Sequence, residues 1–102
     1  MILLAPSERQ FFIPFADEAV TFTDTASNGG LTASYITLSR LVVIRFTAGA
    51  GKLRFTQQAA TTSNGLDVHN GDLLELNKAE AEFLSGIRVG STDLTGWATY
   101  YE

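Results

Sequence analysis

The chain contains no cysteine and a single histidine, His69, which excludes several kinds of site. Without thiols, the protein can form no disulfide, no zinc–thiolate centre and no cysteine nucleophile. One imidazole is too few for a metal site that is built from several histidines. Small secreted β domains often depend on disulfides, so the lack of cysteine favours a cytoplasm or a virus particle as the setting.

Basic residues are also scarce, because 7 Lys and Arg stand against 11 Asp and Glu, which gives a net charge of −4. Nucleic-acid binding needs a basic stripe, whereas these basic residues are dispersed, so no nucleic-acid partner is expected. The longest aliphatic run, residues 41–44, is far shorter than the roughly 20 residues that span a bilayer, so no membrane partner is expected. The first residues lack the basic region of a signal peptide, which predicts synthesis in a cytoplasm.

What the chain does contain is a succession of short runs of β-branched and aromatic residues, separated by turn signals. Turns are predicted where Asn and Gly allow a positive φ, at residues 28–30, 49–51, 64–65 and 70–72. Strands are predicted over residues 10–15, 19–23, 35–47, 52–57, 73–76, 83–89 and 96–101. Residues 24–34 are small and polar, which predicts a mobile loop or arm.

Six to eight short strands with polar turns predict an all-β fold, a single-domain β-sandwich of ordinary or jelly-roll type. The domain is expected to cover residues 1–102, with N-terminal strands and a loop or arm over 1–35 and the core sheet region over 36–102. One short helical turn is predicted to start at Asn77, because Glu80 follows three positions later as in a capping box. Alternation places Val42, Ile44 and Phe46 on one face of their strand.

The strand over residues 41–44 is apolar on both faces, so its second face must be covered by another part of the chain or by a neighbouring subunit. In the first strand, Phe12 points away from Phe11 and Phe15 and is the better candidate for an interface. In the last strand, Trp97 and Tyr101 share a face that we expect in the core, which leaves Tyr100 exposed. The candidate assembly interface therefore consists of Phe12, Leu41, Val43 and Tyr100.

No pattern in the chain indicates catalysis, a cofactor or a metal. The sequence of residues 49–52 is superficially similar to a phosphate-binding loop, but Phe46 occupies the first glycine position and Leu53 follows the lysine. The carboxylates have no partner that the sequence can place within reach, and no G-x-S-x-G motif is present. The protein is therefore not expected to be an enzyme.

A longer pattern begins with the apolar strand and small-residue turn of residues 41–50, LVVIRFTAGA, and continues with residues 53–56, LRFT. A polar stretch with Thr61, Thr62 and Gly65 follows, and then come residues 71–76, 83–84, 87–89 and 98–101. In this pattern, residues 36–101 resemble a family of small virion proteins from tailed bacteriophages. The resemblance implies a β-sandwich that binds other virion proteins and has no catalytic residues.

The leading hypothesis is a head decoration or cement protein of the virion, which binds the major capsid protein or other virion proteins as a homo-oligomer, a dimer or trimer. A head–tail connector or tail accessory protein is the alternative within the same class. A carbohydrate-binding β-sandwich that uses Trp97 or Tyr100 is the alternative from another class. No cofactor is expected under any of these hypotheses.

Overall fold

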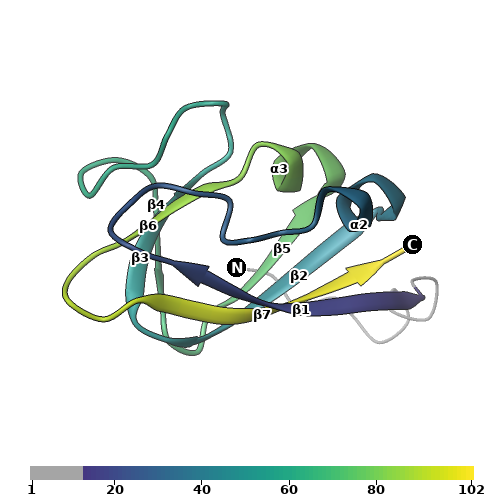
Figure 1. Cartoon of the computed structure of the whole chain (residues 1–102), viewed down its shortest axis with the longest axis horizontal. Coiled ribbons are helices and arrows are strands. Elements are labelled where there is room, and N and C mark those ends of the chain that lie inside the picture. Colours follow the sequence, from purple (N-terminus) through teal and green to yellow (C-terminus); the bar gives the residue numbers. More distant parts are fainter. Residues whose placement is uncertain (1–12) are drawn as a thin grey trace.

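A computed structural model describes residues 13–102, which form two small antiparallel sheets and two short helices (Figure 1). The four-stranded sheet has the order β1 (Pro14–Phe22), β7 (Leu94–Tyr101), β2 (Leu41–Ala48) and β5 (Leu73–Asn77). The three-stranded sheet has the order β4 (Leu66–His69), β3 (Ala50–Arg54) and β6 (Ser85–Arg88). The helices are α2 (Ala33–Leu38) and α3 (Lys78–Glu82). The predicted all-β fold is confirmed, with a second short helix in addition to the predicted one.

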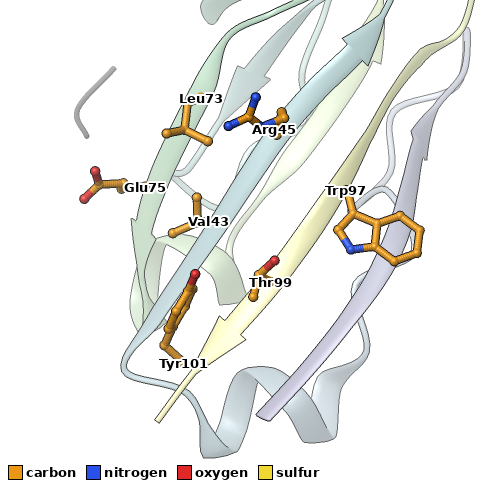
Figure 2. Close-up of a pocket in the computed structure, with 7 residues that line it drawn as sticks. All are labelled: Val43, Arg45, Leu73, Glu75, Trp97, Thr99 and Tyr101. Atoms are coloured by element: carbon orange, nitrogen blue, oxygen red, sulfur yellow. The ribbon is translucent and has the colours of Figure 1, made fainter. Parts of the chain in front are cut away.

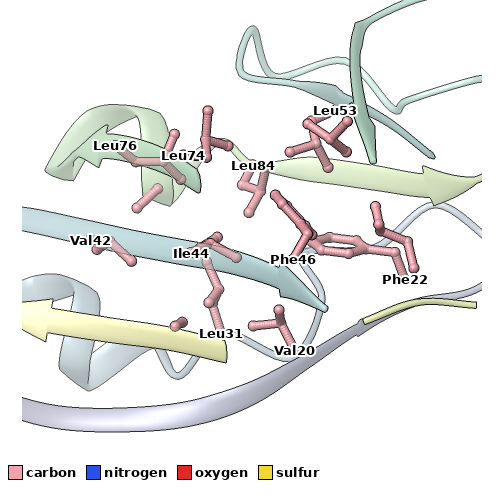
Figure 3. Packing of buried hydrophobic residues seen from close by; sticks show 14 of the residues in the cluster. Val20, Phe22, Leu31, Val42, Ile44, Phe46, Leu53, Leu74, Leu76 and Leu84 are labelled. Atoms are coloured by element: carbon pink, nitrogen blue, oxygen red, sulfur yellow. The ribbon is translucent and has the colours of Figure 1, made fainter. Parts of the chain in front are cut away.

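The core lies between the two sheets, where alternate residues of each strand point inward (Figure 3). Val42, Ile44 and Phe46 of β2 are almost completely buried, as their alternation predicts. Removing such side chains from water is the main favourable term in folding, at about 25 cal/mol per Å² of apolar surface. The inward residues of the other strands complete the same cluster, which also includes Val20, Phe22, Leu53, Leu74, Leu76, Leu94 and Tyr100.

The chain passes from β2 to β3, and so from one sheet to the other, through Gly49. This residue has a φ of 82°, in the left-handed region that glycine adopts without strain. A Cβ at this position would lie 2.4 Å from the backbone oxygen of Asp93. Both the conformation and the close approach therefore require glycine at this corner.

The predicted strand over residues 35–47 is wrong in its first part, because Ala33–Leu38 forms helix α2. The carbonyl of Thr32 accepts hydrogen bonds from the N–H groups of Tyr35 and Ile36, at 3.0 and 3.1 Å. Ile36 is buried, and Tyr35 packs against other aromatic rings of the core. Burial at this place thus outweighs the preference of these residues for a strand.

Residues 24–34, which the sequence predicts as a mobile loop or arm, are tied to both sheets. Ser27 and Gly86 exchange two backbone hydrogen bonds, and the N–H of Thr21 donates to the carbonyl of Gly29. The side chain of Leu31 is part of the core. The segment therefore closes one side of the domain rather than extending from it.

Helix α3 begins as predicted, with a complete capping box. The backbone N–H of Glu80 donates to Oδ1 of Asn77, and the backbone N–H of Asn77 donates to Oε1 of Glu80, at 2.8 and 2.9 Å. Helices α2 and α3 lie side by side, where Ile36 and Ala81 reach the core (Figure 1). Within residues 13–102, neither helix is long or apolar enough to cross a membrane.

Candidate functional site

The outer face of the four-stranded sheet, the side away from the core, carries aromatic and polar side chains in register. Arg45 lies between Leu73 of β5 and Trp97 of β7. In the next row, Val43 lies between Glu75 and Thr99. Neighbouring strands are about 4.8 Å apart, and residues two apart on one strand are separated by about 7 Å. The rows therefore bring these side chains onto one compact area.

A cavity of about 210 Å³ occupies this area, and we call it the Trp97 cavity (Figure 2). Three neighbouring strands, β5, β2 and β7, supply its walls. Its lining combines aliphatic, aromatic and charged groups, and consists of Val43, Arg45, Leu73, Glu75, Trp97, Thr99 and Tyr101.

Trp97 is the largest apolar group on this face, and 48 % of its surface is exposed. Arg45, its cross-strand neighbour, is also exposed, and within residues 13–102 its guanidinium forms no ion pair. An indole and an unpaired guanidinium on neighbouring strands give a surface that can both stack on a ligand and donate hydrogen bonds to it.

The prediction that Tyr100 is an exposed contact residue is wrong, because its side chain is completely buried. The prediction that Trp97 and Tyr101 lie in the core is also wrong. The side chains of β7 alternate as predicted, but the face that carries Tyr100 points into the core, and the face that carries Trp97 and Tyr101 points outward. The inner face of β7 contains the small residues Gly96 and Ala98. A Cβ at Gly96 would lie 2.5 Å from the backbone oxygen of Arg45 on the neighbouring strand β2, so glycine at this position allows the two strands to approach closely.

Of the other residues of the predicted assembly interface, the two that the structure describes offer little free surface. Leu41 is only 8 % exposed, and Val43 is half-buried in the wall of the Trp97 cavity. Phe12 lies outside the described residues. Their role in assembly stays a prediction. Trp97, which the sequence predicts in the core and offers as a surface contact only in the carbohydrate-binding alternative, is exposed.

The buried Tyr100 belongs to a hydrogen-bond network around Glu18. The phenolic hydroxyl donates to Oε2 of Glu18, and the N–H and hydroxyl of Thr32 donate to the two carboxylate oxygens at 2.9 and 2.8 Å. Desolvation raises the pKa of Glu18, but the hydrogen bonds from Tyr100 and Thr32 outweigh it and lower the pKa below its usual value. Burial and the Glu18 carboxylate raise the pKa of Tyr100. The network joins β1, β7 and the start of α2.

A second surface lies at the end of the three-stranded sheet where the chain leaves β3 and later enters β4. Leu66 and Phe83 are 48 % and 40 % exposed there. Two shallow hollows of about 370 and 380 Å³ adjoin them. One hollow is lined partly by Phe55, Asn64 and Leu66, and the other partly by Gln57, Glu82 and Phe83. We call Leu66, Phe83 and these two hollows the loop-end surface.

The loop that borders this surface is held in place. The backbone N–H of Ala60 donates to the hydroxyl of Ser85 at 2.9 Å, and Ala60 itself is buried. Gln57 has a φ of 65°, which is uncommon for a residue other than glycine. Such strain persists only where the surroundings hold the backbone, so the loop presents its surface in a defined shape.

Among the described residues, some of the other charged groups form pairs on the surface. Lys52 pairs with Asp67 on neighbouring strands, and Arg88 pairs with Asp93 at 2.6 Å. The Lys52 ammonium lowers the pKa of Asp67 through a hydrogen bond and its charge. Between residues 13 and 102, no group of three or more His, Asp or Glu side chains could hold a metal ion.

Comparisons with protein-family models, curated proteins and solved structures find no match to this chain. Among residues 13–102, two surfaces are suited to binding a partner or ligand, the Trp97 cavity and the loop-end surface. The two surfaces differ in kind, since the first is a small mixed cavity and the second combines exposed apolar side chains with wider hollows.

Proposed function

We propose that the protein is a non-enzymatic structural protein of a bacteriophage virion, a head decoration or cement protein that binds the major capsid protein and stabilises the capsid lattice. The observation that carries the proposal is the loop-end surface, where Leu66 and Phe83 are exposed beside two hollows. The resemblance of residues 36–101 supports the same function.

Exposed large apolar side chains next to hollows are typical of protein–protein contacts. A few such side chains supply most of the binding free energy in an interface, and they do so by inserting into pockets of the partner. Phe83 and Leu66 can insert in this way, while the hollows accept apolar side chains from the partner. Because the loop is anchored through Ala60, little conformational entropy is lost on binding.

In a capsid lattice, the same weak contact is repeated at many equivalent positions. Many copies bound at equivalent positions stabilise the shell together, even where each contact alone is weak. A rigid two-layer β domain with one apolar end is sufficient for this purpose, and it needs no reacting groups. Homo-oligomerisation as a dimer or trimer would place several loop-end surfaces on one lattice position.

The proposal is tested with shells of the phage that encodes the chain, purified without this protein and then mixed with it. The wild type should co-sediment with the shells and raise their resistance to heat. The double variant Leu66→Ser, Phe83→Ser should lose most of this binding while its circular dichroism stays that of a folded β domain. Leu38→Ser, which removes an exposed apolar side chain from helix α2, is the matched control and should bind normally.

Counting the copies in intact particles separates the two structural roles. A number set by the symmetry of the head lattice supports decoration. A dozen copies or fewer would indicate the head–tail connector or tail accessory protein instead. Normal shell binding by the double variant would contradict the assignment of the loop-end surface, and failure of the wild type to bind any phage structure would contradict the proposed function.

A further inference from the structure

We propose that the Trp97 cavity is a binding site for a neutral sugar ring, separate from the loop-end surface and independent of the capsid contact. The cavity lies on the outer face of the four-stranded sheet, whereas the loop-end surface is built by the three-stranded sheet and its loop (Figures 1 and 2). The two sites share no lining residue. One domain could therefore bind the capsid and a glycan at the same time.

The apolar part of the site is made by aromatic side chains at two ends of one strand face. Trp97 and Tyr101 are four residues apart on β7, so their Cα atoms are separated by about 13 Å. Each presents an amphipathic ring, with a flat apolar face and one polar atom. A sugar ring has one face made largely of C–H groups, which packs on such an aromatic surface without leaving a hydroxyl unsatisfied.

The polar part of the site lies beside and between the aromatic side chains, because Arg45 is opposite Trp97 on the neighbouring strand and Thr99 lies between Trp97 and Tyr101 on β7. The Arg45 guanidinium, five N–H donors in a plane, comes from β2, and the Thr99 hydroxyl comes from β7. No hydrogen bond joins the side chain of Arg45 or Thr99 to another of residues 13–102. Glu75 from β5 contributes carboxylate oxygens to the same lining. Neighbouring hydroxyls of a sugar both donate and accept, so they match a mixture of donors and acceptors.

Size and charge favour a sugar over other small ligands. The volume of about 210 Å³ is below the roughly 300 Å³ at which pockets for drug-sized molecules begin, which suits a ligand of one ring or two. Arg45 and Glu75 have opposite charges, so the lining as a whole has no net charge that would favour an anion or a cation. A neutral, hydroxyl-rich ring with one apolar face matches this mixed lining, since it can stack on Trp97 and accept hydrogen bonds from Arg45 and Thr99.

The site contains its own probe, because Trp97 is the only tryptophan of the chain. A ligand that stacks on the exposed indole should shift its fluorescence emission to shorter wavelength and reduce quenching by acrylamide. The purified full chain is titrated with methyl glycosides of glucose, galactose, mannose and N-acetylglucosamine, up to tens of millimolar. Sodium acetate and tetramethylammonium chloride are the charged controls. We expect a saturable change with at least one glycoside and none with either salt.

Matched variants locate the binding. Thr99→Val keeps the shape of the side chain and removes its hydroxyl, and Arg45→Met removes the guanidinium but keeps the aliphatic stem; each should weaken binding about tenfold, as the loss of one to two hydrogen bonds predicts. Trp97→Ala, followed by ligand-observed NMR, should abolish binding. Phe83→Ser, on the loop-end surface, is the control and should bind the glycoside as the wild type does.

Three results would overturn the proposal. The first is the absence of a saturable change with all four glycosides. The second is an unchanged affinity in both Arg45→Met and Thr99→Val, since the ligand would then bind elsewhere. The third is that Trp97→Ala loses shell binding while glycosides cause no change in the fluorescence of the wild type. This result would assign the outer face of the four-stranded sheet to a protein partner. Failure of shell binding by the wild type leaves the glycoside titration unaffected, so the two proposals fail separately.

Discussion

Tyr100 donates its phenolic hydrogen to Oε2 of Glu18, a residue 82 positions earlier in the chain. Tyr100 belongs to β7 and Glu18 to the neighbouring strand β1, and Thr32 at the start of α2 binds the same carboxylate. The tyrosine ring also packs against Phe15 and Tyr35, with ring centroids 6.3 and 5.2 Å away. One polar link thus fixes the position of three elements that are distant in sequence.

Replacing Tyr100 by Phe should lower the free energy of unfolding by about 1.5–3 kcal/mol, the usual contribution of a hydrogen bond to a charged group. The ring keeps its contacts, so the change removes the hydroxyl alone. Urea denaturation followed by circular dichroism measures the effect. Tyr101→Phe, which removes a hydroxyl from the outer face of the same strand, is the control and should change stability by less than about 0.5 kcal/mol. Equal stability of Tyr100→Phe and wild type would show that the link is dispensable.

The same network predicts how stability depends on pH. The folded protein holds the pKa of Glu18 below the value of 4.5 that an unperturbed carboxyl has, so the unfolded state takes up a proton first as the pH falls. The stabilisation from ionised Glu18 is therefore complete above pH 4.5 and is lost as the pH falls through the pKa of the folded state. Glu18→Gln should be less stable than wild type at pH 7, and the difference should shrink below pH 4.

Unfolding in urea at a series of pH values from 7 to 3 measures this difference. Glu82→Gln, an exposed carboxyl at the end of α3, is the control and should leave the pH profile of the wild type unchanged. A constant difference between Glu18→Gln and wild type over the whole series would mean that the carboxylate charge contributes nothing to stability.

Alternation in β2 could be read from the sequence because only one choice of face buries three large side chains together. Val42, Ile44 and Phe46 point inward, as predicted. The same consideration gave the wrong face for β7, where each face carries an aromatic residue and the sequence does not show which one meets the core. The structure decides in favour of Tyr100, whose hydroxyl finds a carboxylate inside, and leaves Trp97 outside.

The two proposed surfaces could not be predicted for a related reason. The Trp97 cavity depends on the register of β5, β2 and β7, which are separated in sequence by other elements. The loop-end surface depends on the hydrogen bond between Ala60 and Ser85, 25 residues apart. Local patterns indicate which residues form strands, but they do not indicate which strands become neighbours.

Shortening a side chain on the inner face of β2 should destabilise the protein more than shortening one on its outer face. Ile44→Ala should cost about 2–5 kcal/mol of stability, because it leaves a cavity in the packed cluster around this side chain. Val43→Ala, on the outer face of the same strand, should cost clearly less, since Val43 is only half-buried. Thermal unfolding of both variants under the same conditions provides the comparison. A larger loss for Val43→Ala would show that the outer face is covered more tightly than the inner one.

The corner at Gly49 provides the final prediction, because two glycines with a similar φ have different surroundings. Gly49 has a φ of 82° and Gly71 a φ of 92°, so alanine at either position loses about 1–2 kcal/mol through the left-handed conformation alone. A Cβ at Gly71 meets no atom within 4 Å, whereas a Cβ at Gly49 lies 2.4 Å from the Asp93 oxygen. Gly49→Ala should therefore destabilise the protein by more than Gly71→Ala, as measured by urea denaturation. If the two variants lost the same free energy of unfolding, the left-handed conformation alone would account for the loss. The backbone at Asp93, just before β7, would then move enough to accommodate the added Cβ at residue 49.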